Sequence, residues 1–381
     1  MREFPVSAHH ASRHRPMRIL GMLARLAMAC VLLATPVMAR AETTTTAPSS
    51  TKPDNPFALA KSAYAAGKFA DALKLAKPLA EKGDLNAQVL LGTIYNNGAG
   101  VKADPKEAAK WFRKAADQGD AGAQYALGML TMLGIGMKPD PVGAHKLFEA
   151  AAAQNHAASQ AELGLMYLSG NGGPVDLDKA GKFFEASAKS GNASGQYYLG
   201  SLYASGKGKP QDMKRAAYLF ELAADQGHTE AAYQLGLMLQ DGTGVEKNPQ
   251  LAAIRLRDAA KAGLPGAQTA LGFAYLDGTG VDKDETTAAK WFTEAALRGD
   301  GLAQDKLARL YYLGQGVTRD VSAALLWLTI AEKSGYEDKT LRTVIEPEIT
   351  TEIQAKVDGQ IKQLTSGSAK TPAKTDKKAV K

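Results

Sequence analysis

Cysteine is almost absent from this chain of 381 residues, which contains only Cys30. Cys30 lies in a hydrophobic segment near the N-terminus, and cleavage after Ala41 would remove it. A chain without cysteine forms no disulfides, even in a compartment that permits them. We therefore expect the mature protein to be stabilised by packing alone.

Long hydrophobic runs are also missing from the N-terminal segment. Its longest uncharged run, Leu26 to Ala39, has 14 residues, whereas a membrane-spanning helix needs about 20. Arginines at positions 2, 13, 15 and 18 precede the segment 19–39 that contains this run, and Ala39-Arg40-Ala41 places small residues at the spacing of a signal-peptidase site. This pattern predicts a signal peptide over 1–41 and a periplasmic or secreted protein with no stable membrane span. A lipid anchor on Cys30 is the alternative, because "LAMAC" loosely resembles a lipoprotein box.

The middle of the chain lacks excess positive charge. Residues 1–41 have a net charge of +5 and residues 366–381 a net charge of +4, so the total of +7 leaves −2 for everything between them. Nucleic-acid binding requires a basic face, so no nucleic-acid partner is expected. The segments 42–55 and 366–381 lack apolar residues to bury, and we expect both to be disordered.

Residues with catalytic or metal-binding chemistry are few. After residue 41 the chain has three histidines, His145, His156 and His228, with no His-x-x-x-His motif and no Gly-x-Ser-x-Gly motif. The Ser-x-x-Lys at Ser49 lies in the segment expected to be disordered. The sequence therefore predicts no catalytic residue, no metal ligand and no cofactor-binding residue.

Glycine, in contrast, is abundant and periodic. In "LGFAYLDGTGVDKD" (271–284), Gly278 and Gly280 have a spacing that can cradle a phosphate. The same pair recurs every 36 residues, at Gly98/Gly100, Gly134/Gly136, Gly170/Gly172, Gly206/Gly208, Gly242/Gly244, Gly278/Gly280 and Gly314/Gly316. No copy has the Gly-Lys-Ser/Thr ending of a phosphate-binding loop, so these glycines are interpreted as structural.

Each 36-residue frame predicts a helical hairpin. Frame position 1 falls at Gly83, Gly119, Asn155, Gly191, Gly227, Gly263 and Gly299. In the first frame, small or apolar residues at positions 5, 9, 12 and 13 (Ala87, Leu91, Ile94, Tyr95) have helical spacing. The first glycine of the pair follows as a C-cap, and then an acid or amide as the N-cap of a second helix. These predicted N-caps are Asp104, Asp140, Asp176, Asp212, Asn248, Asp284 and Asp320.

The second helix has alanine at one frame position in every copy, followed by bulky residues such as Trp111-Phe112 and Trp291-Phe292. The only tryptophans, Trp111, Trp291 and Trp327, share one frame position. A single hairpin cannot bury its own apolar face, so neighbouring hairpins must stack. We interpret the tryptophans as part of the core between repeats.

The repeats resemble the Sel1-like repeat family, which is related to tetratricopeptide repeats. The resemblance is carried by the "LGTIY", "LGLMY", "LGSLY" and "LGFAY" segments, by the Gly-x-Gly-Val loop and by the Ala-x-x-Trp-Phe-x-x-Ala-Ala helix. It implies an all-α fold, a right-handed α-solenoid of stacked helical hairpins. The predicted divisions are a tetratricopeptide-like hairpin (56–82), seven repeats (83–118, 119–154, 155–190, 191–226, 227–262, 263–298 and 299–334) and capping helices (335–365).

The resemblance also implies a function, that of a non-catalytic scaffold for protein–protein interaction. For an exported chain, the implied settings are cell-envelope regulation and exopolysaccharide assembly. One alternative is a repeat-fold hydrolase of the β-lactamase-like type, although the cysteine-rich relatives linked to β-lactams rely on a disulfide in each repeat. Another alternative is an envelope protein that binds polysaccharide through exposed aromatic residues.

Helix geometry predicts where a partner binds. At 100° per residue, frame positions 4, 7, 8, 11, 14 and 15 of the first helices point away from the core. In tetratricopeptide-type solenoids the first helices line the concave surface, where a groove could bind proteins or extended peptides. The residues predicted to line it are Tyr125, Met129, Leu165, Tyr197, Tyr198, Tyr233, Leu237, Asp241, Phe273 and Asp277. The alternative is that positions 7 and 8 are half-buried against the next repeat.

Overall fold

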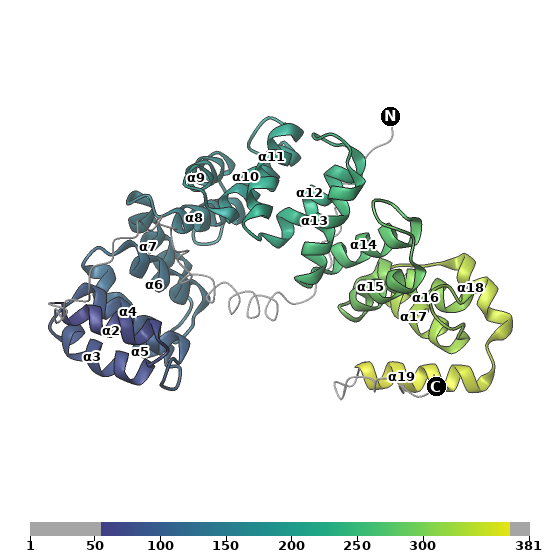
Figure 1. Ribbon diagram of the computed structural model, residues 1–381, viewed down its shortest axis with the longest axis horizontal. Coiled ribbons are helices and arrows are strands. Elements are labelled where there is room, and N and C mark those ends of the chain that lie inside the picture. Colours follow the sequence, from purple (N-terminus) through teal and green to yellow (C-terminus); the bar gives the residue numbers. More distant parts are fainter. Residues whose placement is uncertain (1–54, 366–381) are drawn as a thin grey trace, which may run out of the picture. The chain divides into compact units, whose positions relative to one another are not determined.

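The computed structural model describes residues 55–365, and these residues contain helices and loops but no strand. The predicted signal peptide, Cys30 and the lysine-rich tail lie outside the described residues. The chain divides into two compact units at Leu147/Phe148, and each unit is described by itself. Paired helices follow one another throughout both units (Figure 1), which confirms the all-α repeat fold.

The helices have nearly uniform lengths. Unit 1 contains α2 (Pro56–Ala65), α3 (Phe69–Glu81), α4 (Leu85–Asn97), α5 (Pro105–Asp117), α6 (Ala121–Leu133) and the first part of α7 (Pro141–Ala153). Unit 2 continues with α8 (Ala157–Ser169), α9 (Leu177–Lys189), α10 (Ala193–Ser205), α11 (Met213–Asp225), α12 (Thr229–Asp241), α13 (Pro249–Lys261), α14 (Pro265–Asp277), α15 (Glu285–Leu297), α16 (Gly301–Leu313) and α17 (Val321–Lys333). It ends with α18 (Lys339–Ile345), the 3-10 turn η1 (Glu346–Glu348) and α19 (Thr351–Thr365).

The paired glycines have two different structural roles. The first glycine of every pair is left-handed, with φ between 67° and 78°, and caps the first helix as the sequence predicts. The second glycine is also left-handed. It lies against the start of the second helix of the preceding hairpin at Gly100, Gly136, Gly208, Gly244, Gly280 and Gly316. A Cβ atom at Gly280, for example, would overlap the carbonyl oxygen of Pro249. The second glycine is therefore required for close packing between repeats as well as for its own backbone conformation.

The predicted aspartate row caps the second helices. Asp104 Oδ1 accepts hydrogen bonds from the amides of Lys106 and Glu107, at 3.1 and 3.0 Å. A second row, which was not predicted, caps the first helices from frame position 2. Its members are Asp84, Asp120, His156, Asn192, His228 and Asp300, whereas Leu264 makes no side-chain cap. Most helices of the array thus have a side-chain N-cap, each contributing about 1 kcal/mol.

The core lies between the two helices of each hairpin and between adjacent hairpins. The alanine shared by all second helices is fully buried in every copy (Ala108, Ala144, Ala180, Ala216, Ala252, Ala288 and Ala324). The glycine of the "LG" segments accommodates a large side chain from the second helix: a Cβ atom at Gly92 would lie 2.6 Å from the ring of Phe112. Trp111 is buried among the alanines of α3, as interpreted from the sequence.

Buried glutamines connect successive helices, and these links were not predicted. Gln88 Nε2 donates to the carbonyl oxygen of Ala80 at 3.1 Å, and Gln88 Oε1 accepts from Gln118 Nε2 at 2.8 Å. Gln196 Oε1 accepts from Gln226 Nε2 in the same way, at 2.7 Å. Glutamine occupies this frame position, position 6, in six of the seven repeats. Five of them, Gln88, Gln124, Gln196, Gln268 and Gln304, satisfy backbone or side-chain groups of a neighbouring helix, whereas Gln160 Oε1 has no partner among the described residues.

The C-terminal segment forms two helices, α18 and α19. The 3-10 turn η1 at Pro347 separates them, because proline disrupts a helix interior. Ile345 and Val357 are fully buried, whereas Leu364 is exposed. α19 packs against α17, and Arg319 forms a bidentate ion pair with Glu348 at 2.7 Å.

Candidate functional site

The predicted groove residues differ in their exposure. Six of them are half-buried, in unit 2: Leu165, Tyr197, Tyr198, Tyr233, Leu237 and Phe273. Asp241 and Asp277 are exposed at the C-terminal ends of α12 and α14. Tyr125 and Met129 are buried, with exposed fractions of 8% and 9%, so the prediction that they line an open surface is corrected. Helical periodicity gives a side chain's direction but not how closely its neighbours cover it.

Two tyrosines at frame position 7, Tyr197 and Tyr233, reach the next repeat. The Tyr197 ring stacks on the His228 ring, with centroids 4.5 Å apart, and lies 5.7 Å from Phe220. The Tyr233 hydroxyl lies against Gly266 at the start of α14, which has no side chain to obstruct it. These rings therefore pack on one side, and their half-buried state leaves the remainder of each ring in contact with solvent.

The aromatic contacts extend onto frame positions 8 and 11. Tyr198 stacks on Phe184 of α9 at 5.2 Å and meets Tyr197 edge-on at 5.0 Å. Phe273 on α14 meets Phe292 of the same hairpin at 5.1 Å, also edge-on. Such contacts fix the orientation of aromatic side chains. The first helices of unit 2 thus carry a set of immobilised, half-buried rings.

Acidic groups accompany these rings. Glu162 on α8 is half-buried, and burial raises the pKa of its carboxyl to about 7. No hydrogen bond or ion pair joins this carboxyl to another residue within 55–365. Burial, and then the nearby Tyr197, Glu162 and Glu230, raise the pKa of Tyr198 to about 12. Strongly shifted ionisable groups are more frequent at functional sites than elsewhere.

His228 connects the acidic groups to the aromatic ones. Its Nδ1 atom accepts the Ala231 amide at 3.3 Å and lies 3.4 Å from the Glu230 carboxylate. Burial lowers the pKa of His228, although Glu230 opposes the shift. His156 caps α8 in the same way, through Ser159. Both histidines occupy frame position 2, where other repeats have Asp or Asn, and this shared position is the sequence signal for their capping role.

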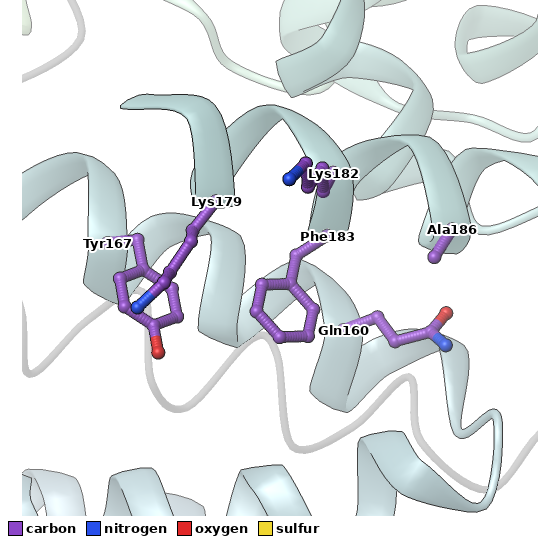
Figure 2. A pocket seen from close by; sticks show the side chains of 6 residues that line it. All are labelled: Gln160, Tyr167, Lys179, Lys182, Phe183 and Ala186. Atoms are coloured by element: carbon purple, nitrogen blue, oxygen red, sulfur yellow. The ribbon is translucent and has the colours of Figure 1, made fainter. Parts of the chain in front are cut away.

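A pocket of about 420 Å³ lies on unit 2 between α8 and α9. Figure 2 shows its lining: the parallel rings of Tyr167 and Phe183, the ammonium of Lys179 above Tyr167, and the amide of Gln160 beneath Ala186. Lys182 completes the lining. None of these residues belongs to the predicted groove. Phe183 occupies the second-helix position of the tryptophans, which is interpreted from the sequence as core.

Within residues 55–365, no group of three or more His, Cys, Asp and Glu side chains is arranged to hold a metal ion. In the same part of the chain, no helix combines the length and the apolar character needed to cross a membrane.

The stacked hairpins and the ring-bearing first helices define a helical-repeat protein of the α-solenoid class. The Sel1 repeat matches seven consecutive segments of the chain, at residues 85–120, 121–156, 157–192, 193–228, 229–264, 265–300 and 301–336. The chain therefore belongs to the Sel1 repeat family. Each segment begins two residues after the corresponding 36-residue frame.

The chain is also similar to solved structures, although no curated protein matches it. A Sel1 repeat protein from Oxalobacter formigenes shares 34% sequence identity, over 77% of this chain and 86% of that chain, with a TM-score of 0.57. A protective antigen present in uropathogenic Escherichia coli strains and displaying an SLR fold shares 27% identity, over 85% of this chain and 88% of that chain, with a TM-score of 0.43. Sel1 repeat proteins are generally scaffolds for protein interaction.

Proposed function

We propose that this protein is a non-catalytic scaffold. It binds an extended segment of a partner protein across α8, α10, α12 and α14, the first helices of four successive hairpins. The observation that carries this proposal is the set of half-buried rings on these helices. Tyr197, Tyr198 and Phe273 are each fixed on one side by an aromatic neighbour, and each keeps part of its surface in solvent.

Immobilised rings suit a binding surface. A partner that covers them gains apolar contact without first restricting mobile side chains, and aromatic residues are enriched where protein interfaces are buried. Leu237 adds a half-buried aliphatic group, and Asp241 and Asp277 supply exposed carboxylates at the helix ends. This combination of an apolar centre and a polar edge is the usual composition of an interface.

We also propose that the protein is exported and acts in the periplasm or outside the cell. The support is the sequence of residues 1–41, with its arginines, its short apolar run and its Ala39-Arg40-Ala41 site. Sequencing the N-terminus of the native protein should identify Glu42 as its first residue. A lipid-modified Cys30 at the terminus would replace this proposal with an anchored protein.

Site-specific photo-crosslinking tests the scaffold. Benzoylphenylalanine at Tyr198 keeps an aromatic ring against Phe184 while it presents a reactive group to a partner. The matched control is the same substitution at Tyr218, which is 60% exposed on the second helix α11. In cells, position 198 should give one discrete covalent adduct with another protein, and position 218 should not. Equal adducts at both positions, or an adduct at position 218 alone, would refute the proposed surface.

A further inference from the structure

The pocket between α8 and α9 exists at the position where three other repeats carry tryptophan. Phe183 shares its frame position with Trp111, which is buried with an exposed fraction of 6%, and with Trp291 and Trp327, which are half-buried. The smaller ring of Phe183 is half-buried, and it stacks on Tyr167 at 5.6 Å with an interplanar angle of 6°. The two parallel rings form an apolar platform at the surface of this hairpin (Figure 2).

One residue that lines this pocket, Gln160, has a buried hydrogen-bond acceptor. Gln160 has an exposed fraction of only 6%, and its Oε1 atom has no hydrogen-bond partner among the described residues. The equivalent oxygens of Gln88 and Gln196 each accept a hydrogen bond from a glutamine 30 residues later. The residue 30 positions after Gln160 is Ser190 rather than glutamine, and no hydrogen bond joins these two side chains. A buried acceptor without a partner is costly, so a ligand that donates a hydrogen bond to it gains affinity.

The rim of the pocket is positively charged. Lys179 Nζ lies 5.0 Å from the centre of the Tyr167 ring and 3.8 Å from the Asp176 carboxylate. Lys182 is exposed and forms no ion pair with another described residue. Two ammonium groups beside an aromatic platform complement a ligand that is both aromatic and anionic.

We propose that this pocket binds a tryptophan or tyrosine side chain flanked by acidic residues in a partner protein. The ligand ring packs on Phe183 and Ala186, and the flanking carboxylates pair with Lys179 and Lys182. The ligand ring's N–H or O–H group donates to Gln160 Oε1 once the Gln160 amide turns toward the pocket. The volume of about 420 Å³ lies within the range of small-ligand sites. This site is separate from the proposed surface of first helices, so either one can fail without the other.

The test uses three synthetic peptides and isothermal titration calorimetry at low salt. The probe is acetyl-Asp-Trp-Asp-amide, and the matched controls are acetyl-Asp-Leu-Asp-amide and acetyl-Lys-Trp-Lys-amide. The first peptide should bind saturably, and each control should bind about tenfold more weakly or worse, since it lacks either the ring and donor or the anions. Failure of the first peptide to bind at millimolar concentration, or equal binding of either control, would overturn the proposal.

Two variants locate the binding. Phe183→Trp fills the pocket with the residue that three other repeats already carry, so it should preserve the fold and weaken binding at least tenfold. Lys182→Gln changes an exposed side chain, and it should weaken binding about two- to fivefold, with the difference lost at high salt. The pocket is not the site if Phe183→Trp, with an unchanged melting temperature, binds like the wild type. It is likewise not the site if Lys182→Gln leaves the affinity unchanged at low salt.

Discussion

Replacing Glu162 by glutamine should stabilise the protein above pH 4.5, with the full gain above about pH 7. Burial raises the pKa of this carboxyl from 4.5 to about 7, and no cation among the described residues pairs with it. A group whose pKa is higher in the folded state favours folding fully below its unfolded pKa, and that contribution is lost as the pH rises through the folded pKa. The wild type should therefore lose stability between pH 4.5 and about pH 7, relative to a variant that cannot ionise.

The size of the effect follows from the shift. One pKa unit corresponds to about 1.4 kcal/mol, so the full shift sets an upper limit of about 3 kcal/mol. Since the side chain keeps some contact with solvent, we expect about 1–2 kcal/mol. Glu162→Gln should match the wild type at pH 4 and exceed its free energy of unfolding by this amount at pH 8.

Urea unfolding followed by circular dichroism at pH 4, 6 and 8 measures the difference. The matched control is Glu221→Gln, because Glu221 is exposed on α11, and this change should have little effect at any of the three pH values. A gain that is equal at pH 4 and pH 8 would show that ionisation is not its cause. A variant less stable than the wild type at pH 8 would show that the carboxylate has a stabilising partner, and would refute the reasoning.

Four further substitutions test other parts of the structure by thermal or urea unfolding. Gly280→Ala should lower the free energy of unfolding by at least about 2 kcal/mol, because its Cβ atom would overlap Pro249. Gly278→Ala should lower it by about 1 kcal/mol, for its left-handed backbone alone. Equal losses would contradict the packing role of the second glycine. Gln304→Ala should lower the free energy of unfolding by about 1–3 kcal/mol, since it removes a hydrogen-bond partner from the buried Ala296 carbonyl. An unchanged free energy of unfolding would show that the glutamine links are dispensable. Burial lowers the pKa of His228, so the wild type should lose stability as the pH falls below 6.5. His228→Asn keeps a capping side chain and should remove this loss. An unchanged pH profile of stability would exclude His228 as the source.

The sequence by itself determined the repeat and its local geometry. The left-handed C-cap glycines and the aspartate caps follow from interactions within a few residues, and these recur every 36 residues. Gly98 shows this well, because only the nearby chain decides whether a left-handed C-cap is needed. The capping row at frame position 2 and the glutamines at position 6 were visible in the same alignment of repeats, although their bonding partners were not.

The tertiary structure decided which side chains are covered. Tyr125 and Tyr197 occupy the same frame position and point in the same helical direction, yet one is buried and the other is half-buried. The pocket beside Phe183 and the unpaired state of Glu162 depend in the same way on residues from other helices. Helical periodicity fixes the direction of a side chain, but burial, pKa and pocket volume depend on how closely neighbouring hairpins approach, and that distance is set by the packed side chains of several repeats together.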